Sequence, residues 1–389
     1  MRVLIASDTY HPHVNGASYF TQRLAHALAN AGHEVAVVAP GPQLTATREM
    51  HGKVTFYGVR SFPIFIVPKF RFVMPILSGI SGRVRAALRE FKPDIVHIQM
   101  HFLVSRMALN EARKLNIPVV ATNHFMPENL THYLHMPKGV TDVINTLAWQ
   151  DCVRIYEKTH GVSAQTHTGK AALTPWYKRS IQIISCGIDL ARFSPNVDPT
   201  PARQEYHLPE KPILISVCRL DKEKKVDEVL RAVAKALQRA DFHFVVAGHG
   251  AEEKKLKKLA KTLGIEEQVT FAGFVPDDLL PPLYAAAAVA INAGIAELQC
   301  IAAMEGMATG LPVLAARAVA LPELVHDGEN GYLFEPGNTA ELAGRIVELM
   351  QDAGLRARMG QKSLAIISHH DINLTLENFE EFYRTALPA

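Results

Sequence analysis

Short apolar runs alternate with amphipathic stretches along the whole chain. Residues 2–6 (RVLIA) form a continuous apolar run before a polar loop, which is the pattern of a strand buried on both faces. Apolar residues at helical spacing follow from Phe20 to Ala31, with Ser18 as the expected N-cap. A second apolar run at 34–39 completes the unit. Because parallel strands need such crossover connections, the pattern predicts a doubly wound parallel sheet.

The same alternation continues through the chain in two blocks. Residues 196–212 are rich in proline and charge and lack periodicity, which predicts a connection between domains. We therefore expect an N-terminal domain at 1–195, joined by a returning helix at 373–389, and a C-terminal domain at 196–372. The further expected strands are 94–99, 118–122, 181–185, 213–218, 242–247 and 268–271, and the further expected helices are 104–115, 226–239, 252–263 and 374–387.

The composition fits a globular protein with two cores. The chain has 389 residues, of which 48% are hydrophobic, and a single core rarely grows beyond about 250–300 residues. The net charge of +3 is far below that of a dedicated nucleic-acid-binding protein. The four cysteines form no C-x-x-C pair, so neither a zinc site nor a disulfide framework is predicted. No apolar run reaches the ~20 residues that cross a bilayer, so we expect a cytoplasmic protein.

Two loops at expected strand ends carry groups that suit a phosphate. Gly16 has no side chain to keep its backbone amide from a phosphate, although the same glycine could simply form a turn. Arg219 ends the strand at 213–218, and Lys224 follows on the same loop. Arginine holds phosphate oxygens through paired hydrogen bonds and lysine adds a point charge, so these cations suit a diphosphate. A solvated charged loop is the alternative.

Two carboxylates, Glu297 and Glu305, lie eight residues apart on what we expect to be one helix. Eight residues is just over two turns, so both side chains should project to a similar side. Their neighbours are almost all apolar, and two buried acids without a polar ligand would be costly. One carboxylate could meet sugar hydroxyls and the other a ribose, and the helix N-terminus offers free amides to a phosphate; exposed carboxylates without a ligand are the alternative. The chain has no G-x-G-x-x-G, which argues against a dinucleotide-dependent dehydrogenase.

Taken together, these residues resemble a known family, the retaining glycosyltransferases of GT-B architecture, specifically family four. The resemblance covers nearly the whole chain and is specific as a combination, whereas each motif alone is not. It implies an α/β fold with two Rossmann-like doubly wound parallel-sheet domains facing across a cleft. The motifs are Pro12 with Gly16, Gly32-His33-Glu34-Val35, Gly187-Ile188-Asp189 with Phe193 and Pro195, Arg219-Leu220 with Glu223-Lys224, Gly248-His249-Gly250, Gly273 to Pro276, and Glu297 with Glu305.

The resemblance also implies a role for individual residues. Arg219 and Lys224 would neutralise the departing diphosphate. Glu297 would bind the hydroxyls of the donor sugar and Glu305 the ribose, while His124 would line the sugar site in the first domain. The implied catalytic residues are His124, Arg219, Lys224 and Glu297, and the implied donor-binding residues are Gly16, Arg219, Lys224, Gly250, Val275, Glu297, Leu298, Gln299, Cys300, Ile301 and Glu305.

The chain departs from the family pattern near the expected diphosphate. Lys225 stands where the family usually has glycine, and Ala293 and Gly294 stand where it usually has proline and serine. Cys300 occupies a position that is normally glycine, in the turn that faces the phosphate. A side chain at that turn could crowd the diphosphate or be accommodated by a small shift, so these positions bear on donor affinity and on activity.

The acceptor side is marked by residues 62–77, which combine aromatic side chains with Lys69 and Arg71. Such a segment could lie in a lipid interface with its cations near anionic head groups, and a hydrophobic loop packed at the cleft is the alternative. The comparable segment of lipid-glycosylating family members looks similar. We therefore expect a peripheral protein at the inner face of the cell membrane, with a nucleotide sugar and a lipid as partners and no nucleic acid.

The expected chemistry needs neither a metal nor a cofactor. No D-x-D pair lies in a suitable loop, and His97 and His101 are placed on and after a strand, where they do not share a helical face. The lysine-rich run at 254–261 is interpreted as the solvated face of a helix.

The predicted function is retaining, metal-independent transfer of a hexose from a nucleoside-diphosphate sugar of the UDP-glucose or GDP-mannose type to an acceptor hydroxyl. The acceptor is expected to be a membrane lipid such as a diacylglycerol, which makes the protein an enzyme of glycolipid biosynthesis. Two alternatives stay open at this point. One is a sugar-nucleotide epimerase or hydrolase, and the other is a catalytically impaired nucleotide-sugar-binding protein.

Overall fold

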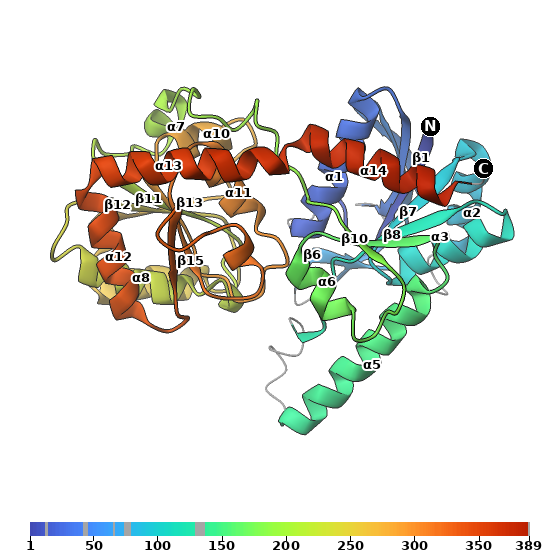
Figure 1. The fold of residues 1–389 in the computed structure, drawn as a ribbon, viewed down its shortest axis with the longest axis horizontal. Coiled ribbons are helices and arrows are strands. Elements are labelled where there is room, and N and C mark those ends of the chain that lie inside the picture. The colour runs from blue at the N-terminus through green and yellow to red at the C-terminus, as the bar shows by residue number, and fades with distance from the viewer. Residues whose placement is uncertain (12–14, 42–45, 65–66, 74–78, 129–136, 388–389) are drawn as a thin grey trace. The chain divides into compact units, whose positions relative to one another are not determined.

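The computed structural model describes residues 1–11, 15–41, 46–64, 67–73, 79–128 and 137–387. The chain forms two compact units, of which unit 1 is Met1–Ser185 with Thr375–Ala389 and unit 2 is Cys186–Leu374 (Figure 1). The division between them lies ten residues before the expected boundary at 195/196. Residues after Ser185 join unit 2 because the main chain of Ile188 is hydrogen-bonded to His370 and Ile372.

Unit 1 is built on an eight-stranded sheet with the strand order β10-β9-β8-β7-β1-β2-β4-β3. The strand pairs of this sheet are parallel except β3 with β4. Its strands are β1 (Arg2–Ser7), β2 (Glu34–Pro40), β3 (Thr47–His51), β4 (Val54–Val59), β7 (Ile95–Gln99), β8 (Val119–Thr122), β9 (Gly161–Ala164) and β10 (Ile181–Ile183), and a separate antiparallel pair is formed by β5 (Phe62–Ile64) and β6 (Val67–Phe72). The described helices are α1 (Gly16–Asn30), α2 (Ile80–Phe91), α3 (Leu103–Lys114), α5 (Lys138–Tyr156), α6 (His167–Leu173) and α14 (Ile372–Ala386).

Unit 2 contains a six-stranded, fully parallel sheet with the order β13-β12-β11-β14-β15-β16. Its strands are β11 (Ile213–Val217), β12 (His243–Ala247), β13 (Val269–Gly273), β14 (Val289–Asn292), β15 (Val313–Ala316) and β16 (Gly331–Phe334). Its helices are α7 (Thr200–Glu205), α8 (Val226–Ala236), α9 (Glu253–Thr262), α10 (Leu280–Ala285), α11 (Ile301–Ala308), α12 (Thr339–Gln351) and α13 (Ala353–Ile367), with short 3-10 turns at η1 (Lys222–Lys224), η2 (Glu266–Gln268), η3 (Leu321–Glu323) and η4 (Ser368–His370). The prediction of parallel α/β sheets in both halves of the chain is confirmed.

One sequence expectation differs from the structure at the start of unit 2. Residues 196–212 were expected to form an aperiodic connection, but they include helix α7. Ala202 of α7 and Leu208 after it are buried in the hydrophobic core of unit 2. Two buried apolar positions in a short segment rich in proline and charged residues form no periodic pattern from which a helix could be predicted.

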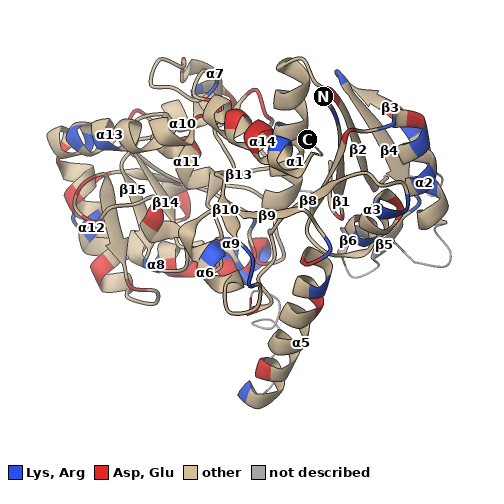
Figure 2. Cartoon of the chain, turned by 45° about the vertical axis from the view of Figure 1, so that its right-hand side comes forward, with Lys and Arg blue, Asp and Glu red and all other residues tan. Residues whose placement is uncertain are grey.

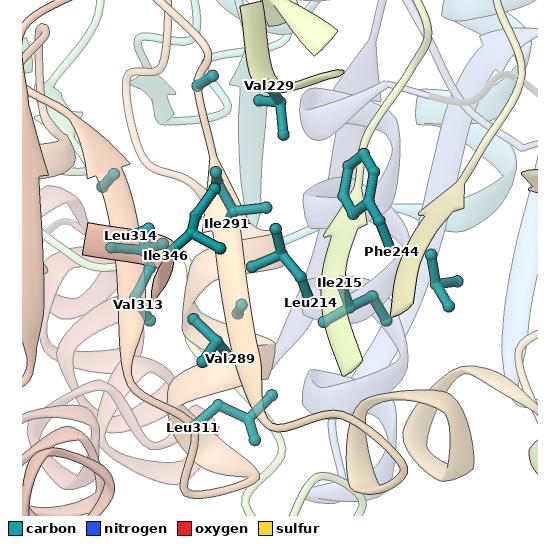
Figure 3. Close-up of a cluster of buried hydrophobic side chains, with 14 of the residues drawn as sticks. Leu214, Ile215, Val229, Phe244, Val289, Ile291, Leu311, Val313, Leu314 and Ile346 are labelled. Atoms are coloured by element: carbon teal, nitrogen blue, oxygen red, sulfur yellow. The ribbon is translucent and has the colours of Figure 1, made fainter. Parts of the chain in front are cut away.

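The core of unit 2 fixes the strand ends from which its functional loops leave. Leu214 and Ile215 of β11 lie between Phe244 of β12 and Ile291 of β14, and Val229 of α8 lies on the same cluster (Figure 3). These side chains are almost completely buried. Each contributes about 1.5–3 kcal/mol through removal of its apolar surface from water, so the strand ends are held firmly.

Helix α14 returns to unit 1. Phe379, Phe382 and Tyr383 are buried in unit 1, and a Cβ atom on Gly161 would lie 2.7 Å from the Phe382 ring. A glycine at position 161 therefore lets α14 approach the sheet at β9.

Helices α2 and α3 are joined through a buried carboxylate, and this contact predicts an acid-sensitive element of stability. Glu111 is 4% exposed and accepts hydrogen bonds from Arg85 Nε at 2.6 Å and Lys114 Nζ at 2.7 Å. The hydrogen bond from Arg85 is the main cause that lowers the pKa of Glu111 to about 2. Its contribution to stability is thus present above pH 4.5 and is lost as the pH falls toward 2.

We expect Glu111→Gln to lower the free energy of unfolding by about 1–3 kcal/mol at pH 7, with the difference from wild type shrinking below pH 4. Urea unfolding at several pH values measures this difference. Glu90→Gln is the matched control, because Glu90 also pairs with an arginine, Arg48, but both side chains are about half exposed. An equal loss in both variants, or a loss for Glu111→Gln that is independent of pH, would contradict the assignment.

Candidate functional site

In unit 2, the predicted donor residues gather at the carboxyl ends of neighbouring strands. β11 lies between β12 and β14 in the sheet, and the loop after each strand carries predicted site residues. Arg219 and Lys224 follow β11, Gly250 follows β12, and Glu297 follows β14. Ligands of open parallel sheets bind at this edge, so the placement supports a common site within unit 2.

Arg219 is held by two carboxylates of its own loop. Its guanidinium donates to Asp221 and, through Nη2, to Glu223 Oε1 at 2.8 Å. The Arg219 side chain is 33% exposed, whereas that of Glu223 is only 7% exposed. The carboxylates orient the guanidinium while leaving part of it open to an anion.

Lys224 forms an ion pair with Glu297 across the loops after β11 and β14. Lys224 Nζ lies 2.6 Å from Glu297 Oε1, and each side chain is 14% exposed. Burial alone lowers the pKa of Lys224, but the Glu297 carboxylate raises it more, so the net shift is upward and the ammonium stays charged. The structure thus brings together two residues that lie far apart in the sequence.

Glu297 and Glu305 do not share a helix, contrary to the sequence prediction. Helix α11 begins at Ile301, so Glu297 lies in the preceding loop while Glu305 lies on the helix and is 4% exposed. Gly294 explains part of this loop, because a Cβ atom there would lie 2.8 Å from Glu297 Oε1 and 2.9 Å from Asn292 Oδ1. The glycine that replaces the usual serine therefore allows Glu297 to turn back toward β14.

Cys300 occupies the N-cap position of α11 and its side chain is buried in the core of unit 2. Asn292 Nδ2 donates a hydrogen bond to its sulfur at 2.9 Å. Burial raises the pKa of the Cys300 thiol well above its ordinary value. The thiol is therefore neutral and adds no negative charge near the helix N-terminus.

Lys225 lies in the left-handed region with φ of +53°, which accounts for the glycine usual at this position. An L-residue there costs roughly 1–2 kcal/mol. Lys225 Nζ pairs with Glu228 Oε1 at 3.1 Å on the next helix turn. Its cation is thus engaged away from the Lys224–Glu297 pair.

Two glycines let the loop after β12 pack on the loop after β11. A Cβ atom on Gly248 would lie 1.9 Å from the carbonyl oxygen of Cys218, and one on Gly250 would lie 2.2 Å from that of Leu220. Leu220 N donates to the His249 carbonyl at 2.9 Å, which joins the two loops. This close packing fixes the backbone on which Arg219 stands.

The remaining predicted donor residues of unit 2 lie on adjacent loops. Val275 is 8% exposed and follows β13, while Leu298 and Gln299 precede α11 and Ile301 is its first residue. Gln299 Oε1 accepts a hydrogen bond from the Cys186 amide at 2.7 Å. Gln299 therefore ties the first residues of unit 2 to the loop that carries Glu297.

In unit 1, Gly16 is the first residue of α1, directly after the loop that follows β1. The N-cap is Asn15, whose Oδ1 accepts from the Ser18 amide at 2.9 Å, so the prediction that Ser18 caps this helix is wrong. Asparagine is among the best N-cap residues because its side-chain oxygen satisfies an amide of the first turn. A Cβ atom on Gly16 would meet no atom of the described residues within 4 Å, so the space beside it is open within that part of the chain.

His124 follows β8 and is held by two glutamines that the sequence argument missed. Its Nε2 lies 2.7 Å from Gln99 Oε1, and its Nδ1 lies 2.8 Å from Gln165 Nε2. The ring of Phe20 packs on it with centroids 4.9 Å apart. Burial lowers the pKa of His124 to about 3. The available signal was that Gln99, like His124, stands at the end of a predicted strand, whereas the strand β9 that precedes Gln165 was not predicted.

Other predicted features fall outside this arrangement. Among the described residues, no three or more His, Cys, Asp or Glu side chains are grouped as a metal site. Within the same parts of the chain, no helix combines the length and apolar character needed to cross a membrane. The segment 62–77 is only partly described, as the backbone of β5 and β6, and its residues 65–66 and 74–77 lie outside the described residues.

Known proteins match both units of the chain. "Glycosyltransferase Family 4" matches residues 14–192, and "Glycosyl transferases group 1" matches residues 200–365. The alpha-monoglucosyldiacylglycerol synthase of Streptococcus pneumoniae is 29% identical over 90% of this chain and 78% of its own length. A GDP-mannose-dependent alpha-mannosyltransferase of Corynebacterium glutamicum is 26% identical over 92% of this chain and 83% of its own length.

Solved structures show the same fold. Sucrose-phosphate synthase from Thermosynechococcus elongatus superposes with a TM-score of 0.79 at 20% identity and covers 98% of both chains. Anabaena Alr3699/HepE, solved in complex with UDP-glucose, superposes with a TM-score of 0.77 at 19% identity and covers 99% of this chain and 100% of that chain. Such neighbours are GT-B glycosyltransferases, so the expected fold class is confirmed. With a family 4 domain followed by a group 1 domain along nearly its whole length, the chain belongs to the GT-B glycosyltransferases.

Proposed function

We propose that the protein is a retaining, metal-independent hexosyltransferase that uses a nucleoside-diphosphate sugar of the UDP-glucose or GDP-mannose type. In the reaction, the bond from the anomeric carbon to the diphosphate breaks and a bond to the acceptor oxygen forms on the same face of the sugar. The acceptor hydroxyl releases its proton to the departing diphosphate or to water, and the products are a glycoside, a nucleoside diphosphate and this proton. The pairing of Lys224 with Glu297 beside Arg219 is the observation that carries this proposal.

In this reaction, cationic side chains stabilise the negative charge that develops on the diphosphate. When the sugar leaves, the diphosphate gains charge, and preorganised cations at that position lower the barrier. Arg219 supplies a planar fork for phosphate oxygens and Lys224 a buried ammonium. Both are paired with carboxylates, which keeps them charged and oriented until the diphosphate competes for them.

The remaining residues of the proposed site bind the sugar and the nucleotide. Glu297 exchanges part of its pairing with Lys224 for sugar hydroxyls, and the buried Glu305 holds the ribose. Gly16 offers open space beside the backbone for the diphosphate, and His124 lines the sugar site. Leu298, Gln299, Cys300 and Ile301 complete the loop that precedes and starts α11, with Gly250 and Val275 on the neighbouring loops.

The proposed acceptor is a membrane lipid such as a diacylglycerol. Two relatives are named as alpha-monoglucosyldiacylglycerol synthases, and another as a sulfoquinovosyl transferase. The segment 62–77 and helix α5 are the proposed points of peripheral membrane contact. Val143 and Leu147 of α5 are 58% and 59% exposed, and Figure 1 shows α5 extending away from the rest of unit 1. Residues 143–150 of α5 include no Lys, Arg, Asp or Glu, and Figure 2 shows a tan stretch between the red segments of this helix.

The donor and acceptor classes are tested together by incubating the protein with labelled UDP-, GDP- and ADP-sugars and a membrane lipid extract. We expect label from one sugar nucleotide to enter the lipid fraction with unchanged anomeric configuration, with and without EDTA. A free sugar or an epimerised sugar nucleotide would instead indicate a hydrolase or epimerase. Binding of a sugar nucleotide without consumption would indicate an impaired binding protein.

The apolar residues of α5 give a separate prediction about membrane contact. We expect the double variant Val143→Asp/Leu147→Asp to bind phospholipid vesicles at least about tenfold more weakly, because two apolar side chains no longer enter the lipid interface. Sedimentation with vesicles measures the effect. Leu115→Asp is the control, since Leu115 is 38% exposed at the end of α3 in the same unit. Equal vesicle binding by wild type and the double variant would remove α5 from the proposed contact.

A further inference from the structure

Three neighbouring strand ends of unit 1 bring polar side chains together around His124. Gln99 is the last residue of β7, His124 follows β8, and Gln165 follows β9. β7, β8 and β9 are adjacent parallel strands, so these residues lie side by side at the carboxyl edge of the sheet. Gln99 is fully buried and Gln165 is 3% exposed, which shields both contacts to His124 from bulk water.

The two contacts determine where His124 carries its proton. The amide Nε2 of Gln165 can only donate, so His124 Nδ1 must accept at 2.8 Å. The carbonyl Oε1 of Gln99 can only accept, so His124 Nε2 must donate at 2.7 Å. Both contacts require the same neutral tautomer, with hydrogen on Nε2 and a lone pair on Nδ1.

A second layer of side chains holds Gln99 in place. Its Nε2 lies 3.1 Å and 3.2 Å from the two ring nitrogens of His97. His97 Nε2 contacts Thr122 Oγ1 at 2.7 Å, and His97 Nδ1 contacts the Tyr383 hydroxyl at 2.9 Å. His97 and Tyr383 are fully buried, and burial lowers the pKa of His97 to about 3. Tyr383 comes from α14, so the C-terminal helix reaches His124 through three hydrogen-bonded contacts.

We propose that Gln99 and Gln165 are positioning residues that keep the His124 imidazole neutral with its proton on Nε2, and that Tyr383 anchors this arrangement through His97. The meaning for catalysis rests on the proposed function. A histidine whose two ring nitrogens are both engaged lines the sugar site without taking the proton of the acceptor hydroxyl. His124 then adds no ionisation to the pH dependence of transfer between pH 5 and 8.

Few groups around His124 could change its protonation by ionising themselves. Among the described residues, the titratable side chains facing the network are His97 on β7 and Tyr383 on α14. Helix α1 contributes the ring of Phe20, and β9 contributes Ser163, whose Oγ lies 2.8 Å from Thr122 Oγ1. Neither of these ionises in this pH range.

The tautomer is measured directly on the full chain labelled with ¹⁵N at histidine, using two-bond ¹H–¹⁵N correlations of the imidazole rings. The His124 signal is assigned by its loss in His124→Gln. We expect the pattern of a neutral ring protonated on Nε2, unchanged from pH 5.5 to 8.5. Titration of His124 in that range, or the pattern of a proton on Nδ1, would overturn the proposal.

Variants test each partner separately. A carboxylate in Gln99→Glu would lie beside Nε2–H, so we expect the pKa of His124 to rise by about one to three units. Gln99→Met removes the contacts of this amide with His124 and with His97 at similar side-chain size, and we expect it to mix the two neutral tautomers of His124. Tyr383→Phe should shift the His124 nitrogen signals, whereas Tyr177→Phe should not, because the buried Tyr177 hydroxyl has no hydrogen-bond partner among the described residues.

The outcomes separate this inference from the proposed function. Unchanged His124 signals in both Gln99→Met and Tyr383→Phe, with both proteins folded, would refute the positioning roles. The spectra need no sugar nucleotide, so they decide the inference even if the wild-type protein fails to consume UDP-glucose. Failure of that turnover would count against the proposed function and leave the tautomer assignment standing.

Discussion

Arg219→Ala and Lys224→Ala are each expected to slow sugar transfer by about a hundredfold or more. Removing one preorganised partner of developing charge typically costs about 3–4 kcal/mol of activation free energy. The measurement is kcat with the sugar nucleotide and acceptor identified by the labelling experiment. Near-normal kcat in both variants would show that Arg219 and Lys224 do not stabilise the departing diphosphate.

Lys225→Ala is the matched control for these substitutions. Lys225 is the next residue on the same loop, but its ammonium pairs with Glu228 rather than with Glu297. We expect kcat to change less than about threefold, because this charge does not face the proposed diphosphate. A loss as large as that of Lys224→Ala would mean that the loop needs positive charge in general rather than one placed cation.

The effect of Lys224→Ala on stability must be measured separately from its effect on kcat. Loss of the ammonium leaves Glu297 charged, only 14% exposed and without its partner, and an uncompensated buried charge destabilises a protein by several kcal/mol. The double variant Lys224→Ala/Glu297→Gln removes both charges. We expect it to recover thermal stability without recovering kcat, which separates the structural effect from the catalytic one.

Gly248→Ala is expected to lower the free energy of unfolding by about 3 kcal/mol or more and to weaken nucleotide binding. The new Cβ atom would lie 1.9 Å from a backbone carbonyl oxygen, so the loops after β11 and β12 must separate. Arg219 stands on one of these loops, and its displacement reduces its contact with phosphate. Thermal unfolding and titration with UDP measure the two effects.

Gly264→Ala isolates the backbone strain from the steric clash. Gly248 has a φ of +134° and Gly264 one of +70°, but a Cβ atom on Gly264 meets no atom of the described residues within 4 Å. We expect a loss of only about 1–2 kcal/mol and unchanged UDP binding. If both variants lost the same stability, the tight packing of the Gly248 loop would not matter.

The fold was predictable because its buried strands are continuous apolar runs. The continuous apolar side chains of residues 2–6 and 213–218 can be buried only in a parallel sheet with helices on both faces. The helices between such strands each have one apolar face. Their place in chain order then fixed a doubly wound topology. Residues 200–208 escaped prediction because a single short helix with two buried apolar positions gives no periodic signal.

The candidate site was predictable as a set of residues and less so as a geometry. Arg219 and Lys224 follow a clear strand, so their edge of the sheet could be inferred. The start of α11 could not, because the leucine, glutamine, alanines and methionine between Glu297 and Glu305 favour a helix wherever it begins. The contacts of Gln99 and Gln165 with His124 depend on the adjacency of β7, β8 and β9, which sequence spacing does not report.

The return of α14 to unit 1 has a consequence for biosynthesis. Because Phe379, Phe382 and Tyr383 complete the core of unit 1, residues 1–185 leave the ribosome with an apolar surface that their own sequence does not cover. Unit 2 is synthesised entirely before that surface is closed. A nascent chain that stops before Phe379 therefore lacks the side chains that complete the core of unit 1.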